Sequence, residues 1–157
     1  MAISATWNLE LSEKTGHLLG SELTALGINL YLGPSLDILE DPNHVNNGDL
    51  GTRSFGGNPY WVSEMGQAFI SGLHSGSEGK ILVVAKHFPG RGNADRSPQE
   101  EIVTIRKTLE ELKEVELAPF SAVSGSFPSP ENIDGLLISH IRYEGFQGNI
   151  RPTTRPI

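Results

Sequence analysis

The 157-residue chain contains no cysteine, which excludes disulfide bonds, thiol nucleophiles and zinc sites built from cysteine. The same absence leaves the redox compartment open. No apolar run approaches the roughly 20 residues that a membrane-spanning helix needs. The opening residues Met1-Ala2-Ile3-Ser4 lack the basic and apolar regions of a signal peptide. We therefore expect a soluble protein with no membrane partner, and the cellular compartment stays unassigned.

Basic residues are also few, with 12 Lys and Arg against 19 Asp and Glu and a net charge of −7. Without a basic cluster, this charge argues against a nucleic-acid partner. The histidines His17, His44 and His74 share no spacing typical of a metal site, so no metal is predicted. The glycine pattern fits neither a dinucleotide site nor a P-loop, so no cofactor is predicted.

Apolar periodicity predicts alternating helices and strands in a chain whose length suits one domain. We expect helices over 9–26, from Asn58-Pro59 to about Leu73, and from Thr108, with Pro119 ending or kinking the last one. The first helix should face the core with Leu11, Leu18, Leu19, Leu23 and Leu26. Short apolar runs predict strands over 28–32, 81–85 and 135–139. This order implies an α/β fold with a parallel sheet.

Polar residues follow each expected strand, where ligands bind in parallel α/β folds. Five ordered segments carry a family resemblance: 26–37 (LGINLYLGPSLD), 51–56 (GTRSFG), 86–90 (KHFPG), 116–120 (ELAPF) and 137–141 (LISHI). Together they resemble the N-terminal barrel domain of glycoside hydrolase family 3, nearest its β-N-acetylhexosaminidase branch.

The resemblance implies a partial (β/α)8 barrel, with about three parallel strands and covering helices. It also implies that residues 1–157 are a single fragment of that domain, with no second domain and without the strand that carries the family's nucleophilic Asp. We expect a fragment of a hydrolase acting on terminal β-linked sugars, of β-N-acetylhexosaminidase or β-glucosidase type, that is inactive alone. The alternative is a non-catalytic carbohydrate-binding or regulatory member of the family.

Three residues match the family's sugar-binding positions: Arg53, Lys86 and His87. We expect them to converge on the C-terminal rim of the strands, although each could instead order its own loop. Asp37 and His140 are further substrate-binding candidates, with capping a turn and packing into the barrel top as their respective alternatives. The resemblance also implies at least one cis peptide bond between Lys86 and Pro89, with Phe88-Pro89 as the first candidate and Lys86-His87 as the second.

The family's acid/base element is altered in this chain. Where the resemblance places an Asp-Ser-His element, the sequence has Ser97-Pro98-Gln99, which cannot orient and donate a proton as an Asp–His pair does. Asp95 is the candidate substitute acid, with Glu100 and Glu101 nearby. Arg91 stands where the family usually has His, and we give it no role.

Two further expectations concern surfaces. The mixed charges of 104–117 are typical of a solvated helix face. A slice of a closed barrel leaves apolar strands uncovered, so we expect a homo-oligomer. The loss of burial should be greatest at Leu82, Val83, Val84, Leu136, Leu137 and Ile138.

Overall fold

The computed structural model describes residues 2–41, 50–95, 103–125 and 129–147. The helices are η1 (Ala2–Thr6, 3-10), α1 (Leu9–Ala25), α2 (Leu50–Arg53), α3 (Pro59–Gly76), α4 (Leu109–Glu114), α5 (Ala118–Val123) and α6 (Glu144–Gln147). The strands are β1 (Leu30–Tyr31), β2 (Leu82–Phe88), β3 (Thr104–Ile105), β4 (Gly135–Ile138) and β5 (Arg142–Tyr143). No helix in the described segments is long and apolar enough to cross a membrane.

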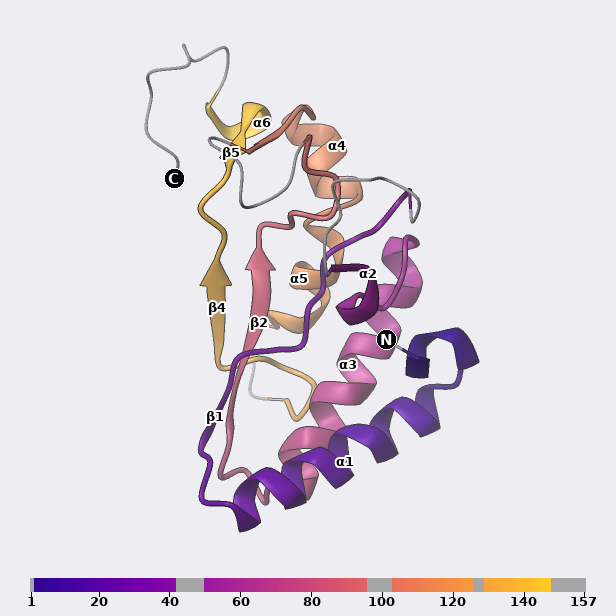
Figure 1. The fold of residues 1–157 in the computed structure, drawn as a ribbon, viewed down its shortest axis with the longest axis vertical. Helices are drawn as coiled ribbons and strands as arrows, with labels where there is room; N and C mark the ends of the chain where they lie inside the picture. The colour runs from indigo at the N-terminus through magenta and orange to yellow at the C-terminus, as the bar shows by residue number, and fades with distance from the viewer. Residues whose placement is uncertain (1, 42–49, 96–102, 126–128, 148–157) are drawn as a thin grey trace.

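The main sheet has the strand order β1-β2-β4, and both pairings are parallel (Figure 1). The three strands lie where apolar runs predicted them, although β1 is shorter than expected and β2 continues through Lys86 and His87 to Phe88. Lys86 and His87 are therefore part of the strand rather than of the loop behind it. A second parallel pair, β3 with β5, was not predicted, because each strand has only two residues.

The helix starts follow the capping signals in the sequence. The side chain of Asn58 accepts a hydrogen bond from the backbone N–H of Trp61 at the start of α3. Thr108 and Glu111 form a complete capping box at the start of α4. α4 ends before Pro119, which lies in the first turn of a separate helix, α5, where its missing N–H costs no hydrogen bond.

The main core lies between one face of the sheet and helices α3 and α5. Val83 and Ala85 of β2 pack in one buried cluster with Phe69 of α3 and Phe120 of α5. The opposite face is open: Leu30 and Leu82 are register partners and remain 47% and 54% exposed. The expected loss of burial therefore holds for Leu82 but is wrong for fully buried Val83, because successive side chains of a strand point to opposite faces.

The face that α1 presents to the core differs from the expected leucine stripe. Leu11, Leu18 and Leu26 are exposed, Leu18 by 59%, whereas Leu19 and Leu23 are partly buried against the core. The buried residues of α1 are Ser12, Gly16 and Gly20. They let the helix backbone approach α3, so closely that an added Cβ on Gly16 would lie 2.1 Å from the carbonyl oxygen of Phe69. Small residues rather than leucines therefore set this packing.

We predict that Gly16→Ala lowers the free energy of unfolding by about 1–2 kcal/mol in urea denaturation. Alanine favours a helix by up to about 1 kcal/mol, but its methyl group would meet α3 backbone, which no side-chain rotation relieves. Gly51→Ala in α2 is the matched control, because its Cβ would lie 3.7 Å from a Leu39 methyl group. Equal stability changes in the two variants would contradict the close packing of α1 on α3.

Candidate functional site

The candidate site is built around the buried carboxylate of Asp37, which follows β1. Asp37 is 0% exposed, and its Oδ2 accepts hydrogen bonds from Ser35 Oγ at 2.7 Å and from His87 Nδ1 at 2.8 Å. Its Oδ1 accepts from the backbone N–H of Arg91 at 2.8 Å, with the N–H of His87 at 3.5 Å. One carboxylate thus joins the end of β1 to the turn that follows β2.

The peptide bonds Lys86-His87 and Phe88-Pro89 are both cis, as the resemblance implied, and Gly33-Pro34 is cis as well. The backbone of Lys86 donates to Pro34 O and accepts from Leu36 N, so it is paired with the segment behind β1. The Phe88 ring packs edge-on against Phe120 at 5.5 Å between centroids. These contacts fix the part of the chain that carries Lys86 and His87.

Arg53 ends α2 and is exposed. The next residue, Ser54, is buried and donates its hydroxyl to the backbone carbonyl of Asp37 at 2.8 Å. Leu39 N donates to Gly56 O at 3.0 Å, which ties the same two segments together a second time. The segment that carries Arg53 and the strand that carries both Lys86 and His87 therefore meet at Asp37, while the convergence of the three side chains in one cleft stays a prediction.

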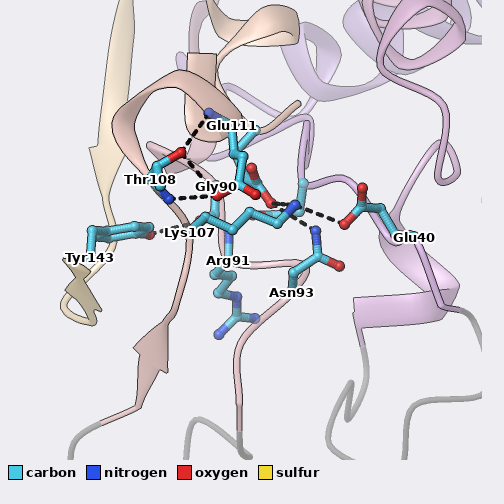
Figure 2. Close-up of polar contacts among 10 residues, drawn as sticks. Glu40, Gly90, Arg91, Asn93, Lys107, Thr108, Glu111 and Tyr143 are labelled. Atoms are coloured by element: carbon cyan, nitrogen blue, oxygen red, sulfur yellow. Dashed lines mark hydrogen bonds and ion pairs between the residues drawn. The ribbon is translucent and has the colours of Figure 1, made fainter. Parts of the chain in front are cut away.

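The turn after β2 needs glycine at two positions. Gly90 has φ +117°, and an added Cβ there would meet Glu116 Cβ at 2.8 Å. A Cβ on Gly92 would lie 1.7 Å from Ile38 O. The hydroxyl of Tyr143 in β5 donates to Gly90 O at 2.8 Å (Figure 2). The β3–β5 pair, although short, thus holds this turn by a side-chain hydrogen bond.

A second buried polar cluster lies against this turn and contains Glu116, which is 0% exposed. Glu116 Oε1 accepts from Asn93 Nδ2 and from Lys107 Nζ, each at 2.7 Å, and Lys107 also reaches Glu40 at 2.7 Å (Figure 2). Burial lowers the pKa of Lys107, but the hydrogen bonds and charges of Glu116 and Glu40 raise it more, for a net increase. The expectation of a solvated face is therefore wrong at Lys107 and Glu116. The pattern of charges along the sequence does not show that these two residues pair inside the folded chain.

The remaining candidates lie around the same rim. His140 is exposed just behind β4, and Ser139 beside it donates its N–H to Phe88 O at 2.7 Å. Asp95 accepts from Thr104 N at 2.9 Å and lies 3.6 Å from an Arg106 nitrogen, so its carboxylate supports the start of β3. Its assignment as the acid stays a prediction. Arg91 turns its guanidinium away from the Lys107 cluster (Figure 2).

Other proposed acid/base positions, Ser97-Pro98-Gln99 with Glu100 and Glu101, lie outside the described residues, as does His44. Within 2–41, 50–95, 103–125 and 129–147, no three acidic or histidine side chains gather in a way that could hold a metal ion. The chemistry that the described rim offers is hydrogen bonding by cationic and imidazole groups.

Comparison with known families and structures identifies the family to which the chain belongs. Residues 1–156 match the Glycosyl hydrolase family 3 N terminal domain. The chain belongs to glycoside hydrolase family 3. A family 3 β-N-acetylglucosaminidase from Paenibacillus sp. str. FPU-7 superposes with a TM-score of 0.81 at 31% identity, over 99% of this chain and 27% of that one. NagZ from Neisseria gonorrhoeae, in complex with N-trifluoroacetyl-D-glucosamine, gives a TM-score of 0.72 at 29% identity, over 92% of this chain and 37% of that one.

The family 3 chain is also similar to curated relatives named beta-hexosaminidase. The protein of Pseudomonas aeruginosa strain PAO1 is 31% identical over 134 residues, which are 85% of this chain and 36% of the relative. The protein of Methylococcus capsulatus is 29% identical over 91% of this chain and 39% of the relative. The chain therefore spans a little over a third of the length of these relatives, and its fold is part of a TIM-type barrel.

We predict that the Tyr143 contact makes the family 3 chain less stable in alkali. Burial raises the pKa of Tyr143 above its ordinary value of 10. The native phenol keeps its proton where an unfolded tyrosine loses it, so the free energy of unfolding falls as pH rises above about 10. Tyr143→Phe should remove that part of the pH slope. At pH 7 it should cost about 1–3 kcal/mol, because Gly90 O loses its donor.

Urea denaturation from pH 7 to pH 11 measures both effects. Tyr60→Phe is the control: Tyr60 is 61% exposed, and we expect a change within about 0.5 kcal/mol at pH 7. If the free energy of unfolding of Tyr143→Phe fell with alkaline pH as steeply as that of the wild type, the attribution of this pH dependence to Tyr143 would be wrong.

Proposed function

We propose that this chain supplies part of the sugar-binding wall of a family 3 hydrolase that acts on terminal β-linked sugars, N-acetylhexosamines foremost. Arg53, Lys86 and His87 are the residues that contact the sugar. The observation that carries this proposal is the anchoring of His87 by a fully buried carboxylate, at the point where the Arg53 segment meets the strand of Lys86 and His87. The relatives' names, beta-hexosaminidase and β-N-acetylglucosaminidase, support the choice of substrate.

The proposed roles follow from the donors that each group carries. A guanidinium presents fixed N–H donors and an ammonium presents rotatable ones, so Arg53 and Lys86 suit hydroxyl and carbonyl oxygens of a sugar. Hydrolysis with retention also needs a nucleophilic carboxylate and an acid/base. The resemblance assigns the nucleophile to a strand beyond this sequence, so we propose that the chain alone binds sugar without hydrolysing it.

We predict saturable binding of N-acetylglucosamine to the chain, followed by NMR chemical-shift changes, and no turnover of 4-nitrophenyl β-N-acetylglucosaminide. Lys86→Met should weaken binding on the order of tenfold, because a charged hydrogen bond is lost. Lys80→Met is the matched control, because Lys80 is an exposed lysine paired with Glu78 away from the rim. Equal affinity in wild type and Lys86→Met would count against the proposed wall.

A second candidate is a non-catalytic carbohydrate-binding or regulatory protein, and Ser97-Pro98-Gln99 favours it. The two candidates differ in a protein that contains this chain together with the rest of the barrel. Turnover of an aryl β-N-acetylglucosaminide or an aryl β-glucoside there supports the hydrolase. Sugar binding without turnover of either substrate supports the binding protein.

We also propose that the chain, produced alone, self-associates through the open face of its sheet. Leu82 is exposed there, and each Å² of bare apolar surface is unfavourable by about 25 cal/mol. Leu82→Glu should shift the mass measured by light scattering at low micromolar concentration toward the monomer. Leu18→Glu, a similarly exposed leucine on α1, should not. A monomeric wild-type chain with cooperative melting would exclude this association.

A further inference from the structure

The hydrogen bonds of Asp37 determine which nitrogen of His87 carries a proton. An ionised carboxylate only accepts hydrogen bonds, and each of its two oxygens already accepts one from Ser35 Oγ or Arg91 N. The contact of 2.8 Å between Asp37 Oδ2 and His87 Nδ1 therefore requires the ring nitrogen to donate. In a neutral imidazole the proton then sits on Nδ1, and Nε2 carries a free lone pair.

The other ring nitrogen of His87 is available to a ligand. Among the described residues, the ring's recorded polar contact is the one from Nδ1 to Asp37. The His87 side chain keeps 16% of its surface exposed, while Asp37 keeps none. Solvent or a ligand can therefore reach His87 but not the carboxylate behind it. Asp37, a substrate-binding candidate from the sequence, has no exposed surface in this structure.

We propose that Asp37 is a positioning residue that holds His87 in the Nδ1-protonated tautomer. In that tautomer Nε2 accepts a hydrogen bond from a ligand hydroxyl. Lys86, the neighbouring residue, has donors only. A rim with a pure donor beside a pure acceptor favours hydroxyl groups, which can accept from one and donate to the other. That the ligand is a sugar rests on the proposed function, whereas the tautomer rests on the Asp37 contacts alone.

The tautomer is tested directly by long-range ¹H–¹⁵N NMR of the histidine rings, at a pH where the spectra show a neutral His87. We expect a pyrrole-like Nδ1 and a pyridine-like Nε2. In Asp37→Asn, the amide oxygen must face Arg91 N, which places the amide N–H₂ group toward His87. Nδ1 then becomes an acceptor, and the proton should move to Nε2. Nε2 protonation in the neutral wild-type ring would overturn the proposal without any variant.

A matched control uses a second Asp–His pair among the described residues. His74 Nε2 lies 3.1 Å from Asp134 Oδ2, at the opposite end of β2 from the rim. Asp134→Asn should change the His74 signals and leave the His87 tautomer as it is. A His87 tautomer that changes equally in both variants would show a general structural effect and overturn the role of Asp37.

Recognition is tested with N-acetylglucosamine analogues that carry fluorine in place of one hydroxyl at C3, C4 or C6. Fluorine cannot donate, so one of them should bind the wild type on the order of tenfold more weakly than the parent sugar. In Asp37→Asn, where Nε2 donates, that difference should fall below about twofold. Equal affinities of all analogues for the wild type would overturn the hydroxyl readout. Failure of every sugar to bind would overturn it together with the proposed function, while the tautomer would still be decided by the spectra.

Discussion

The buried carboxylate of Asp37 is the constraint on which the rim depends. Removing an ionised group from water costs several kcal/mol, and the group is tolerated only where donors surround it. Ser35 Oγ, His87 Nδ1 and Arg91 N meet that need. These donors come from both sides of the β1–β2 pairing, so the carboxylate is satisfied only when the two strand ends have come together. The folding of the rim therefore supplies the hydrogen bonds that this one buried charge requires.

The hydrogen bonds of Asp37 also constrain the turn after β2, because its backbone packs closely against neighbouring segments. The turn that brings Arg91 N to Asp37 passes so near to Glu116 and Ile38 that Gly90 and Gly92 leave no room for a side chain. Tyr143 and Glu116, which lie outside the main sheet, form hydrogen bonds with the same turn. The short β3–β5 pair is small as a sheet, but it positions the hydroxyl that fixes Gly90.

The sequence predicted those parts of the fold in which one residue type has one physical use. The continuous apolar run around Val83 predicted β2, and the Asn58-Pro59 signal predicted the start of α3. Prediction failed where the deciding quantity was a distance between distant segments. Leucine spacing in α1 indicated the wrong face, because the glycine contacts with α3 outweigh it. Glu116 resembled a solvated charge, since its partner Lys107 becomes visible only in the folded chain. The family motifs indicated Lys86 and His87 as site candidates, but no pattern in the sequence showed that the Asp37 side chain is buried.

The burial of the motif residues separates two reasons for their presence. Asp37, Gly90 and Glu116 are each explained by contacts within the chain, so their match to the family follows from folding and says nothing of catalysis. The side-chain atoms of the motif that stay exposed have no such explanation in packing. His87 is the clearest case, because its Nδ1 is bonded to Asp37 while 16% of its side-chain surface stays exposed. A chain that lost its acid/base residues would still need the buried motif residues to fold. Only a chain that binds a ligand needs the exposed ones. The proposed function therefore rests on His87 Nε2 and its neighbours rather than on the motif as a whole.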